Sequence, residues 1–406
     1  MRQTTRRECL AAAGSVGLCA AFGNQLAAAT PRLSQTAPFR RCLVLWMEGG
    51  PSHIDTFIPT RDEHVQTALA DMPFAPAMQA FVAYASDLCV VKSVGGREGE
   101  HVRASSLLHT GFAPSPSFPR PSFGSMVSHS RIDEGLPRYV TLGNQAYGPA
   151  FLGVENGPFV ISDPEQAMRQ IQRLGKRTVE LDALQRFNQL HHLGDSRAIR
   201  DASQRRDASV DSVRRLLATD FGDALDTTRA PSDQRAAYGQ DEFGKRMLAA
   251  RRLLEVGVPI VEVQLGGWDS HVDNLRTVNR LCGQLLPPWI ALIEDLKRTG
   301  QWSDTLIVWV GEFGRTPTIN GRAGRDHYPE IIPVVLAGGN LGGHVVGATD
   351  NQAGSRVGPK HTVADLMATL LFLMGLDTQT EYTTSFGSPT SMTDGGTPID
   401  EIVKLV

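Results

Sequence analysis

Two pairs of carboxylate and imidazole side chains have the residue types and spacing that could do chemistry in this chain. Asp269 and His271 lie two residues apart in "VPIVEVQLGGWDSHVDN", residues 258–274, and Asp326 and His327 are adjacent in "GEFGRTPTINGRAGRDHYP", residues 311–329. Carboxylate oxygen and imidazole nitrogen together suit a divalent ion such as zinc or manganese, and no thiolate ligand is required. The two pairs are therefore candidate metal ligands.

The spacing within each pair predicts how many ions it could serve. Residues two apart on an extended segment face the same side, so Asp269 and His271 could bind one ion. Adjacent residues face opposite sides, which would let Asp326 and His327 serve two neighbouring ions, and two metals side by side can clamp a phosphoryl group during displacement. We expect one or two ions per chain. The alternative is that each pair is a hydrogen-bonded turn on a structural polar edge.

The elements that must position these residues are apolar runs that end in glycine. Five such runs occur: "RCLVLWMEGG" at 41–50, "DLCVVKSVGG" at 87–96, "VPIVEVQLGG" at 258–267, "DTLIVWVGEFG" at 304–314 and "IIPVVLAGG" at 331–339. Short buried strands separated by helical segments are typical of a mostly parallel sheet with helices on both faces. In such a fold ligands bind outside the carboxyl ends of the strands, so we expect the two pairs to meet at that edge.

Further acidic, histidine and arginine residues follow these predicted strands. After the first strand come Glu48, Ser52, His53 and Asp55; after the second come Glu100, His101 and His109; after the fourth come Glu312, Arg315 and Arg325. The two arginines have two interpretations that the sequence leaves open. They could hold loops through carboxylates, or they could bind an anionic ester and stabilise its transition state.

The rest of the chain reads as one domain from residue 30 to residue 406. Helices are predicted at 238–258 and 362–377, where apolar residues recur at helical spacing. The region from 161 to 236 is polar, helical in character and without a glycine-terminated strand, and we interpret it as a helical insertion or cap on the sheet.

The amino terminus has the pattern of an export signal. Arg6 and Arg7 are followed by an apolar stretch from Leu10 to Phe22 and by three alanines at 27–29. Residues 1–29 resemble a twin-arginine signal peptide, which implies the twin-arginine export machinery as a partner and a periplasmic or secreted location. The apolar run is shorter than the roughly 20 residues of a membrane-spanning helix, so no stable membrane anchor is expected.

Composition narrows the classes of partner. The 406 residues are 41% hydrophobic and 20% charged, an ordinary globular composition, and the formal net charge is only -3. Nucleic-acid binders need a basic surface. Nucleic acid is therefore not an expected partner.

Seven segments together resemble an exported bacterial family, the DUF1501 family. They are "GGPSHIDTF", "HVRASSLLHTG", "FLGVENGPF", "YGQDEFGKRMLAARRLLEVGV", "GGWDSHVDN", "GEFGRTPTINGRAGRDHYP" and "DLMATLLFLMGLD", and they extend in family order over nearly all of the chain after the signal. The family is similar to the alkaline phosphatase and sulfatase superfamily. The resemblance implies an alkaline phosphatase-like three-layer α/β sandwich with a metal site at the carboxyl ends of the strands.

The resemblance also implies roles for individual residues. Asp55 or Glu48 would be the acidic ligand after the first strand, and His361 would be a late histidine ligand. The two acid–histidine pairs match the superfamily's central ligand pairs, although Asp269 and His271 are two residues apart rather than four. His101 stands at the nucleophile position, where the superfamily has cysteine, serine or threonine.

These features lead to two functional hypotheses. The first is an exported, metal-dependent hydrolase of phosphate or sulfate esters that acts on a small-molecule or polysaccharide substrate. His101 would then be a covalent nucleophile, or a general base beside a metal-activated water. The second is a non-catalytic exported domain of the same fold that binds a glycan or a protein partner.

Overall fold

The computed structural model describes residues 37–132, 135–176, 211–384 and 387–406. The predicted signal, residues 1–29, lies outside these ranges. None of the helices in the described ranges is both long and apolar enough to cross a bilayer.

An eight-stranded sheet forms the centre of the molecule, with strand order β11-β2-β10-β7-β1-β6-β4-β5. All five runs predicted as strands belong to it. Every neighbouring pair is parallel except the two pairs that β10 makes with β2 and β7. The strands are β1 Arg41–Met47, β2 Leu88–Val91, β4 Tyr139–Leu142, β5 Phe159–Ile161, β6 Ile260–Leu265, β7 Thr305–Gly311, β10 Val334–Ala337 and β11 His344–Val346.

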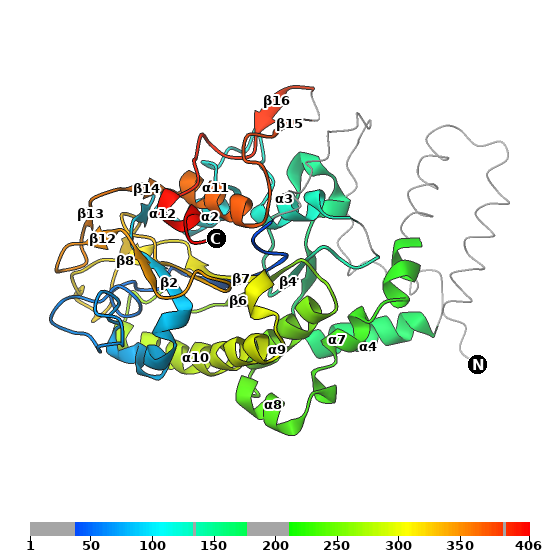
Figure 1. The fold of residues 1–406 in the computed structure, drawn as a ribbon, viewed down its shortest axis with the longest axis horizontal. Helices are drawn as coiled ribbons and strands as arrows, with labels where there is room; N and C mark the ends of the chain where they lie inside the picture. The colour runs from blue at the N-terminus through cyan, green and yellow to red at the C-terminus, as the bar shows by residue number, and fades with distance from the viewer. Residues whose placement is uncertain (1–36, 133–134, 177–210, 385–386) are drawn as a thin grey trace.

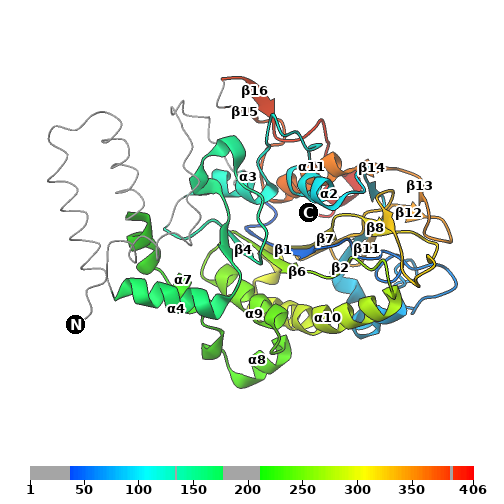
Figure 2. The same cartoon turned by 180° about the vertical axis from the view of Figure 1, so that it is seen from behind.

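Helices cover both faces of this sheet, as Figures 1 and 2 show. One face carries η1 (Pro76–Asp87), α9 (Glu242–Glu255) and α10 (Asn274–Arg298), and the other carries α2 (His101–Thr110), α3 (Phe123–Ser130), α11 (Val363–Leu373) and α12 (Asp400–Val403). Side chains of β1 alternate between two apolar cores: Leu43 and Leu45 pack into the first and Val44 and Trp46 into the second. This period of two is the ordinary consequence of strand geometry. The predicted three-layer α/β architecture is confirmed.

The described part of the region from 161 to 236 begins with the last residue of β5 and is otherwise mostly helical. Its helices are α4 Pro164–Gly175, α7 Phe221–Leu225, η4 Thr227–Arg229 and α8 Ser232–Tyr238. α4 packs against α7 and α9, and α8 packs against α9 and α10. These helices therefore extend the α9 and α10 layer (Figure 1).

Short two-residue strand pairs connect the loops outside the main sheet to one another. β8 (Gly314–Arg315) pairs with β9 (His327–Tyr328), and β3 (Val94–Gly95) pairs with β14 (His361–Thr362). The remaining short elements are β12 Ala348–Thr349, β13 Arg356–Val357, β15 Glu381–Thr383, β16 Pro389–Ser391, η2 Ala150–Leu152, η3 Val154–Asn156 and η5 Trp302–Asp304.

The antiparallel strand β10 explains how the second acid–histidine pair reaches the expected edge. Asp326 and His327 precede β10 in the chain, whereas Asp269 and His271 follow β6. Because β10 runs against β7, its first residue Val334 lies opposite Val310 near the carboxyl end of β7. Both pairs consequently lie at one edge of the sheet. The prediction assumed that all strands are parallel, whereas β10 is antiparallel to its neighbours.

Candidate metal centre

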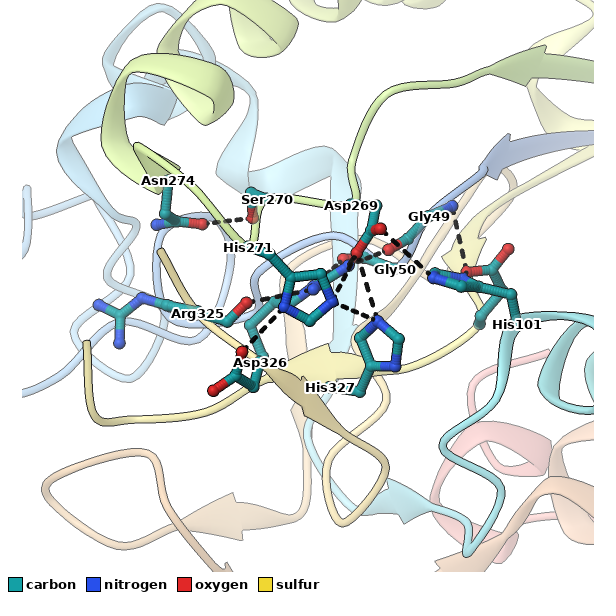
Figure 3. Close-up of polar contacts among 12 residues, drawn as sticks. Gly49, Gly50, His101, Asp269, Ser270, His271, Asn274, Arg325, Asp326 and His327 are labelled. Atoms are coloured by element: carbon teal, nitrogen blue, oxygen red, sulfur yellow. Dashed lines mark hydrogen bonds and ion pairs between the residues drawn. The ribbon is translucent and has the colours of Figure 1, made fainter. Parts of the chain in front are cut away.

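Three imidazole rings converge on the carboxylate of Asp269, from three separate segments of the chain (Figure 3). The Nε2 atoms of His271 and His327 lie 3.2 and 3.3 Å from Asp269 Oδ1, and His101 Nε2 lies 3.6 Å from Asp269 Oδ2. Nε2 of His271 is also 2.9 Å from Nε2 of His327. Among the described residues, His101, Asp269 and His327 form the group whose ligand atoms are close enough to share one ion.

The other nitrogen of each ring contacts an oxygen acceptor. His101 Nδ1 is 2.8 Å from Glu312 Oε2, His271 Nδ1 is 2.8 Å from Asp326 Oδ1, and His327 Nδ1 is 2.7 Å from the carbonyl oxygen of Gly99. A carbonyl or carboxylate oxygen only accepts, so each Nδ1 carries the proton and donates it. In the Nδ1–H tautomer each ring presents a lone pair on Nε2.

In this tautomer the Nε2 atoms of His271 and His327 face each other with lone pairs, 2.9 Å apart. Both also approach Asp269 Oδ1, which accepts a hydrogen bond from Arg315 Nη2. A cation between the two rings would relieve the repulsion of their lone pairs. Histidine ligands of metals usually donate their second nitrogen to a carboxylate or a carbonyl, as all three rings do here. The donor set of three imidazoles and one carboxylate fits zinc, and the site residues fit the metal that the sequence implies.

Arg315 controls the charge of Asp269. Burial would raise the pKa of Asp269, but the hydrogen bond and positive charge of Arg315, followed by the contacts of His327 and His271, outweigh it and hold the pKa below its usual value. Arg315 Nη2 donates to Asp269 Oδ1 over 2.7 Å. Asp269 is consequently a carboxylate at neutral pH, as a metal ligand must be.

The neighbouring groups have the protonation states that ligands need. Burial is the largest cause of the lowered pKa of His327, which keeps this ring neutral. The pKa of Asp326 is also lowered, by hydrogen bonds from His271 and from the side-chain amide of Asn320. Asp326 therefore acts as the ionised acceptor that orients His271, rather than as a ligand beside it.

Glycines allow the loops of the site to pack closely. Gly49 has φ 108°, and a Cβ there would lie 2.5 Å from the backbone nitrogen of Asp269. A Cβ on Gly324 would lie 1.9 Å from the carbonyl oxygen of His271. The loops after β1 and β7 thus press directly on the backbone that carries Asp269 and His271.

The structure shows both arginines holding loops through carboxylates. Arg315 is fully buried and donates to the carbonyl oxygens of Gly49, Gly50 and Arg325 as well as to Asp269. Arg325 donates to both oxygens of Asp55 and to two loop carbonyls. Direct binding of an anionic ester was the other interpretation of the two arginines. It does not fit this geometry, because Arg315 is fully buried with four of its five N–H donors in use and Arg325 is only 7% exposed.

Two predicted ligands lie outside the cluster. Asp55 accepts from Arg325, Ser52 and Asn274, so it fixes the loop that carries Asp326 and His327 instead of facing an ion. His361 lies in β14, and its Nδ1 is 2.8 Å from the hydroxyl of Ser93. The structure brings neither residue to the three imidazoles.

His101 has a different place from the one expected of a nucleophile or base. It is the first residue of α2, whose N-cap is Glu100, and its Nε2 is directed at Asp269 with the other lone pairs. Both ring nitrogens of His101 thus face carboxylates of the cluster, and a ring that held an ion there would not be free to attack an ester or take a proton. We therefore assign His101 to the ligand set.

The residues that orient the ligands had only a weak signal in the sequence. Glu312 was noted after a predicted strand, but its contacts come from two distant segments: α2, with His101 Nδ1 and Ser105 Oγ, and the loop after β1, with the Gly49 amide. Asn320 and the carbonyl of Gly99 had no signal, because a lone asparagine or a loop carbonyl has no distinctive spacing.

His53 is a buried, neutral ring that holds the backbone of Arg315. Its Nε2 is 2.8 Å from the carbonyl oxygen of Ala353, and its Nδ1 accepts the backbone N–H of Arg315 over 3.3 Å. These partners require the neutral Nε2–H form. Burial lowers the pKa of His53 to about 4.

Mild acid is expected to destabilise the fold through His53. The unfolded chain takes up this proton near pH 6.5, whereas the folded chain resists it until about pH 4, so the stabilisation is complete above pH 6.5 and is lost as the pH falls through this window. The expected slope from this group is about 1.4 kcal/mol per pH unit. Urea unfolding of wild type and His53→Gln between pH 7 and pH 4.5 measures it. Equal slopes in the two proteins would contradict this assignment.

A comparison with protein families identifies the group to which the chain is related. The model of the family described as "Protein of unknown function (DUF1501)" matches residues 39–403. The chain belongs to the DUF1501 family. The match includes every ligand and orienting residue of the centre, and it confirms the resemblance seen in the sequence. A search of curated proteins finds no match.

Solved structures similar to this DUF1501 protein share little sequence with it. The PsFucS1 sulfatase from Pseudoalteromonas sp. is 13% identical, with 90% of this chain and 72% of that one covered and a TM-score of 0.41. The C-terminal periplasmic domain of EcEptC from Escherichia coli, in complex with Zn, is 12% identical, with 86% and 87% covered and a TM-score of 0.41. A protein in the alkaline phosphatase superfamily from Vibrio parahaemolyticus is 12% identical, with 93% and 77% covered and a TM-score of 0.38.

Proposed function

We propose that this protein is a metal-dependent hydrolase of phosphate or sulfate esters. The observation that carries the proposal is the convergence of three imidazole Nε2 atoms on one ionised carboxylate, with the Nδ1 of each ring on an oxygen acceptor. The set lies at the carboxyl edge of the sheet and is open to solvent: side chains of His101, Asp269 and His271 are 36%, 45% and 36% exposed. An ion held there could be reached by a substrate.

The ligands would be His101, His271, His327 and Asp269, with zinc or manganese as the ion. Bound there, such an ion supplies Lewis acidity, which polarises an ester oxygen and makes a bound water more acidic. The protein's own residues prepare the site. Arg315 keeps Asp269 ionised, while Glu312, Asp326 and Gly99 hold the three rings in one tautomer and orientation.

Water is the nucleophile in this proposal. The position that opens α2 carries His101, which belongs to the ligand set, and the nearby Ser105 is buried with its hydroxyl donated to Glu312. Water would form the new bond to phosphorus or sulfur, and the ester oxygen would leave with a proton. A ligand role for His101 would account for a histidine at the position where the family resemblance implies a hydroxyl or thiol.

We also propose that the protein acts after twin-arginine export, in the periplasm or outside the cell. The arginine pair and the alanine-rich cleavage pattern of residues 1–29 support this location. Twin-arginine systems export folded proteins, which would allow the metal to be bound before export.

The hydrolase is tested with a panel of soluble esters. We expect turnover of 4-nitrophenyl phosphate, bis(4-nitrophenyl) phosphate or 4-nitrophenyl sulfate that is lost on treatment with a chelator and restored by zinc or manganese. The Asp269→Asn variant should lower kcat by at least about 100-fold, because it removes a charged ligand. A folded, metal-loaded protein that turns over none of the three esters would contradict the hydrolase and favour the non-catalytic binding domain.

A further inference from the structure

Exposed apolar side chains gather beside the metal centre. Val102, Val272, Leu275 and Ile319 are 72%, 45%, 62% and 48% exposed, and they make up four of the ten exposed large hydrophobic residues of the described chain. Val102 follows His101, and Val272 follows His271. Ile319 precedes Asn320, which donates to Asp326 and to the carbonyl of His271. We call these four residues the apolar rim.

The segments of the rim are held together around the ligands. Val272 is bridged to Ala323, the Asp273 amide donates to the carbonyl of Arg322, and the Asn274 amide donates to that of Ala323. Leu275 follows directly in the first turn of α10. Val102 lies on the other segment, at the start of α2, where His101 joins the cluster. The loops therefore hold the backbone of these apolar residues in place, although their exposed side chains do not pack into the core.

Three arginines border the same segments. Arg97, Arg276 and Arg322 are exposed, and within the described ranges none of their guanidinium groups forms an ion pair. Arg276 stands in the first turn of α10, where the helix dipole disfavours a cation, so its position does not serve helix stability. Of the nearby acids, Glu98 is paired with Arg103, Glu100 caps α2 and Asp326 contacts His271, while Asp273 remains exposed.

We propose that the rim and these arginines dock the protein on an anionic lipid surface, so that the metal centre meets an ester carried by the lipid. Exposed aliphatic side chains flanked by unpaired arginines match an interface where acyl chains lie beside anionic headgroups. A sugar polymer would match polar rim residues better than aliphatic ones. This inference rests on the proposed hydrolase, because it names where that enzyme meets its substrate.

Co-sedimentation with vesicles tests the docking surface. Wild type is expected to pellet with phosphatidylglycerol vesicles more than with phosphatidylcholine vesicles. The triple variant Val102→Ser/Leu275→Ser/Ile319→Ser should bind the former at least about tenfold more weakly, since each aliphatic side chain removed from water contributes several-fold. Arg276→Gln/Arg322→Gln should remove the preference for the anionic lipid. All proteins carry the same amino-terminal segment, so a difference in vesicle binding between them is caused by the substituted residues.

The matched control is Val154→Ser/Val160→Ser, which changes two exposed valines on η3 and β5, elements that carry no site residue, and should bind as wild type does. Equal binding of the rim variant and this control, or equal binding of wild type to both lipids, would overturn the inference. Soluble-ester turnover by wild type is measured in parallel. If the protein turns over a soluble ester but its vesicle binding does not depend on the rim, the hydrolase proposal stands and the lipid-surface proposal is wrong. If vesicle binding depends on the rim but no ester is turned over, the lipid-binding surface is supported and the hydrolase proposal is wrong.

Discussion

Replacing His327 with alanine is expected to lower the affinity for zinc by more than about 100-fold and to abolish metal-dependent ester turnover. Loss of an outer partner of a metal ligand already costs about 10- to 100-fold in affinity. His327 is one of the converging rings, 2.9 Å from His271 and 3.3 Å from Asp269. Competition with a chromogenic chelator measures the affinity, and circular dichroism checks that the variant is folded.

His361→Ala is the matched control for this experiment. His361 was also predicted to be a ligand, but the structure places it in β14 on the Ser93 hydroxyl and outside the ligand group. This variant should bind zinc as wild type does. If it loses the metal while His327→Ala retains it, the ligand set assigned here is wrong.

Replacing Arg315 with methionine is expected to destabilise the fold by about 3–5 kcal/mol, because each buried carbonyl left without its donor costs about 1–3 kcal/mol. The fully buried guanidinium donates to three backbone carbonyls and to Asp269. Methionine fills similar space but leaves those carbonyls without a donor. Asp269 would also lose the charge that lowers its pKa, so weaker metal binding should accompany the lower stability.

The free energies of unfolding of Arg315→Met and Arg322→Met, measured in urea, separate the effect of losing a buried arginine from that of losing a positive charge. Arg322 lies in the same loop but is exposed and without an ion pair among the described residues, so its loss should change the free energy of unfolding by less than about 0.5 kcal/mol. Arg315→Lys keeps the charge but lacks the planar fork, and we expect an intermediate loss. Equal effects of the two methionine variants would contradict the role given to Arg315.

The sequence predicted the sheet well because its strands are buried on both faces. β1, β6 and β7 each read as an unbroken apolar run followed by glycine, and the structure pairs all three side by side. The run at 331–339 was also a strand, but its antiparallel direction had no signal. An apolar run specifies burial, whereas direction depends on the path of the loops at its ends.

The site was predictable only where spacing restricts geometry. Asp269, His271, Asp326 and His327 were expected to meet because strand ends share an edge, and the structure places them together. Their separate roles were not visible: Asp326 orients His271, and Arg315 holds Asp269. Such roles depend on which atoms of distant loops come within hydrogen-bond distance. The positions of Asp55 and His361 came from family resemblance alone, which gives chain order but not the distance of a side chain from the ligands.

The central claim is that one cluster of three imidazoles and a carboxylate holds a divalent ion. The most direct measurement is the metal content of the folded protein, as purified and after removal of metal and reloading with zinc or manganese. We expect about one tightly bound ion per chain, absent from the Asp269→Ala/His271→Ala variant, because Asp269 forms the ligand group of the described chain with His101 and His327, and His271 Nε2 lies 3.2 Å from Asp269 Oδ1. A well-folded wild-type protein that takes up no divalent ion would contradict the account.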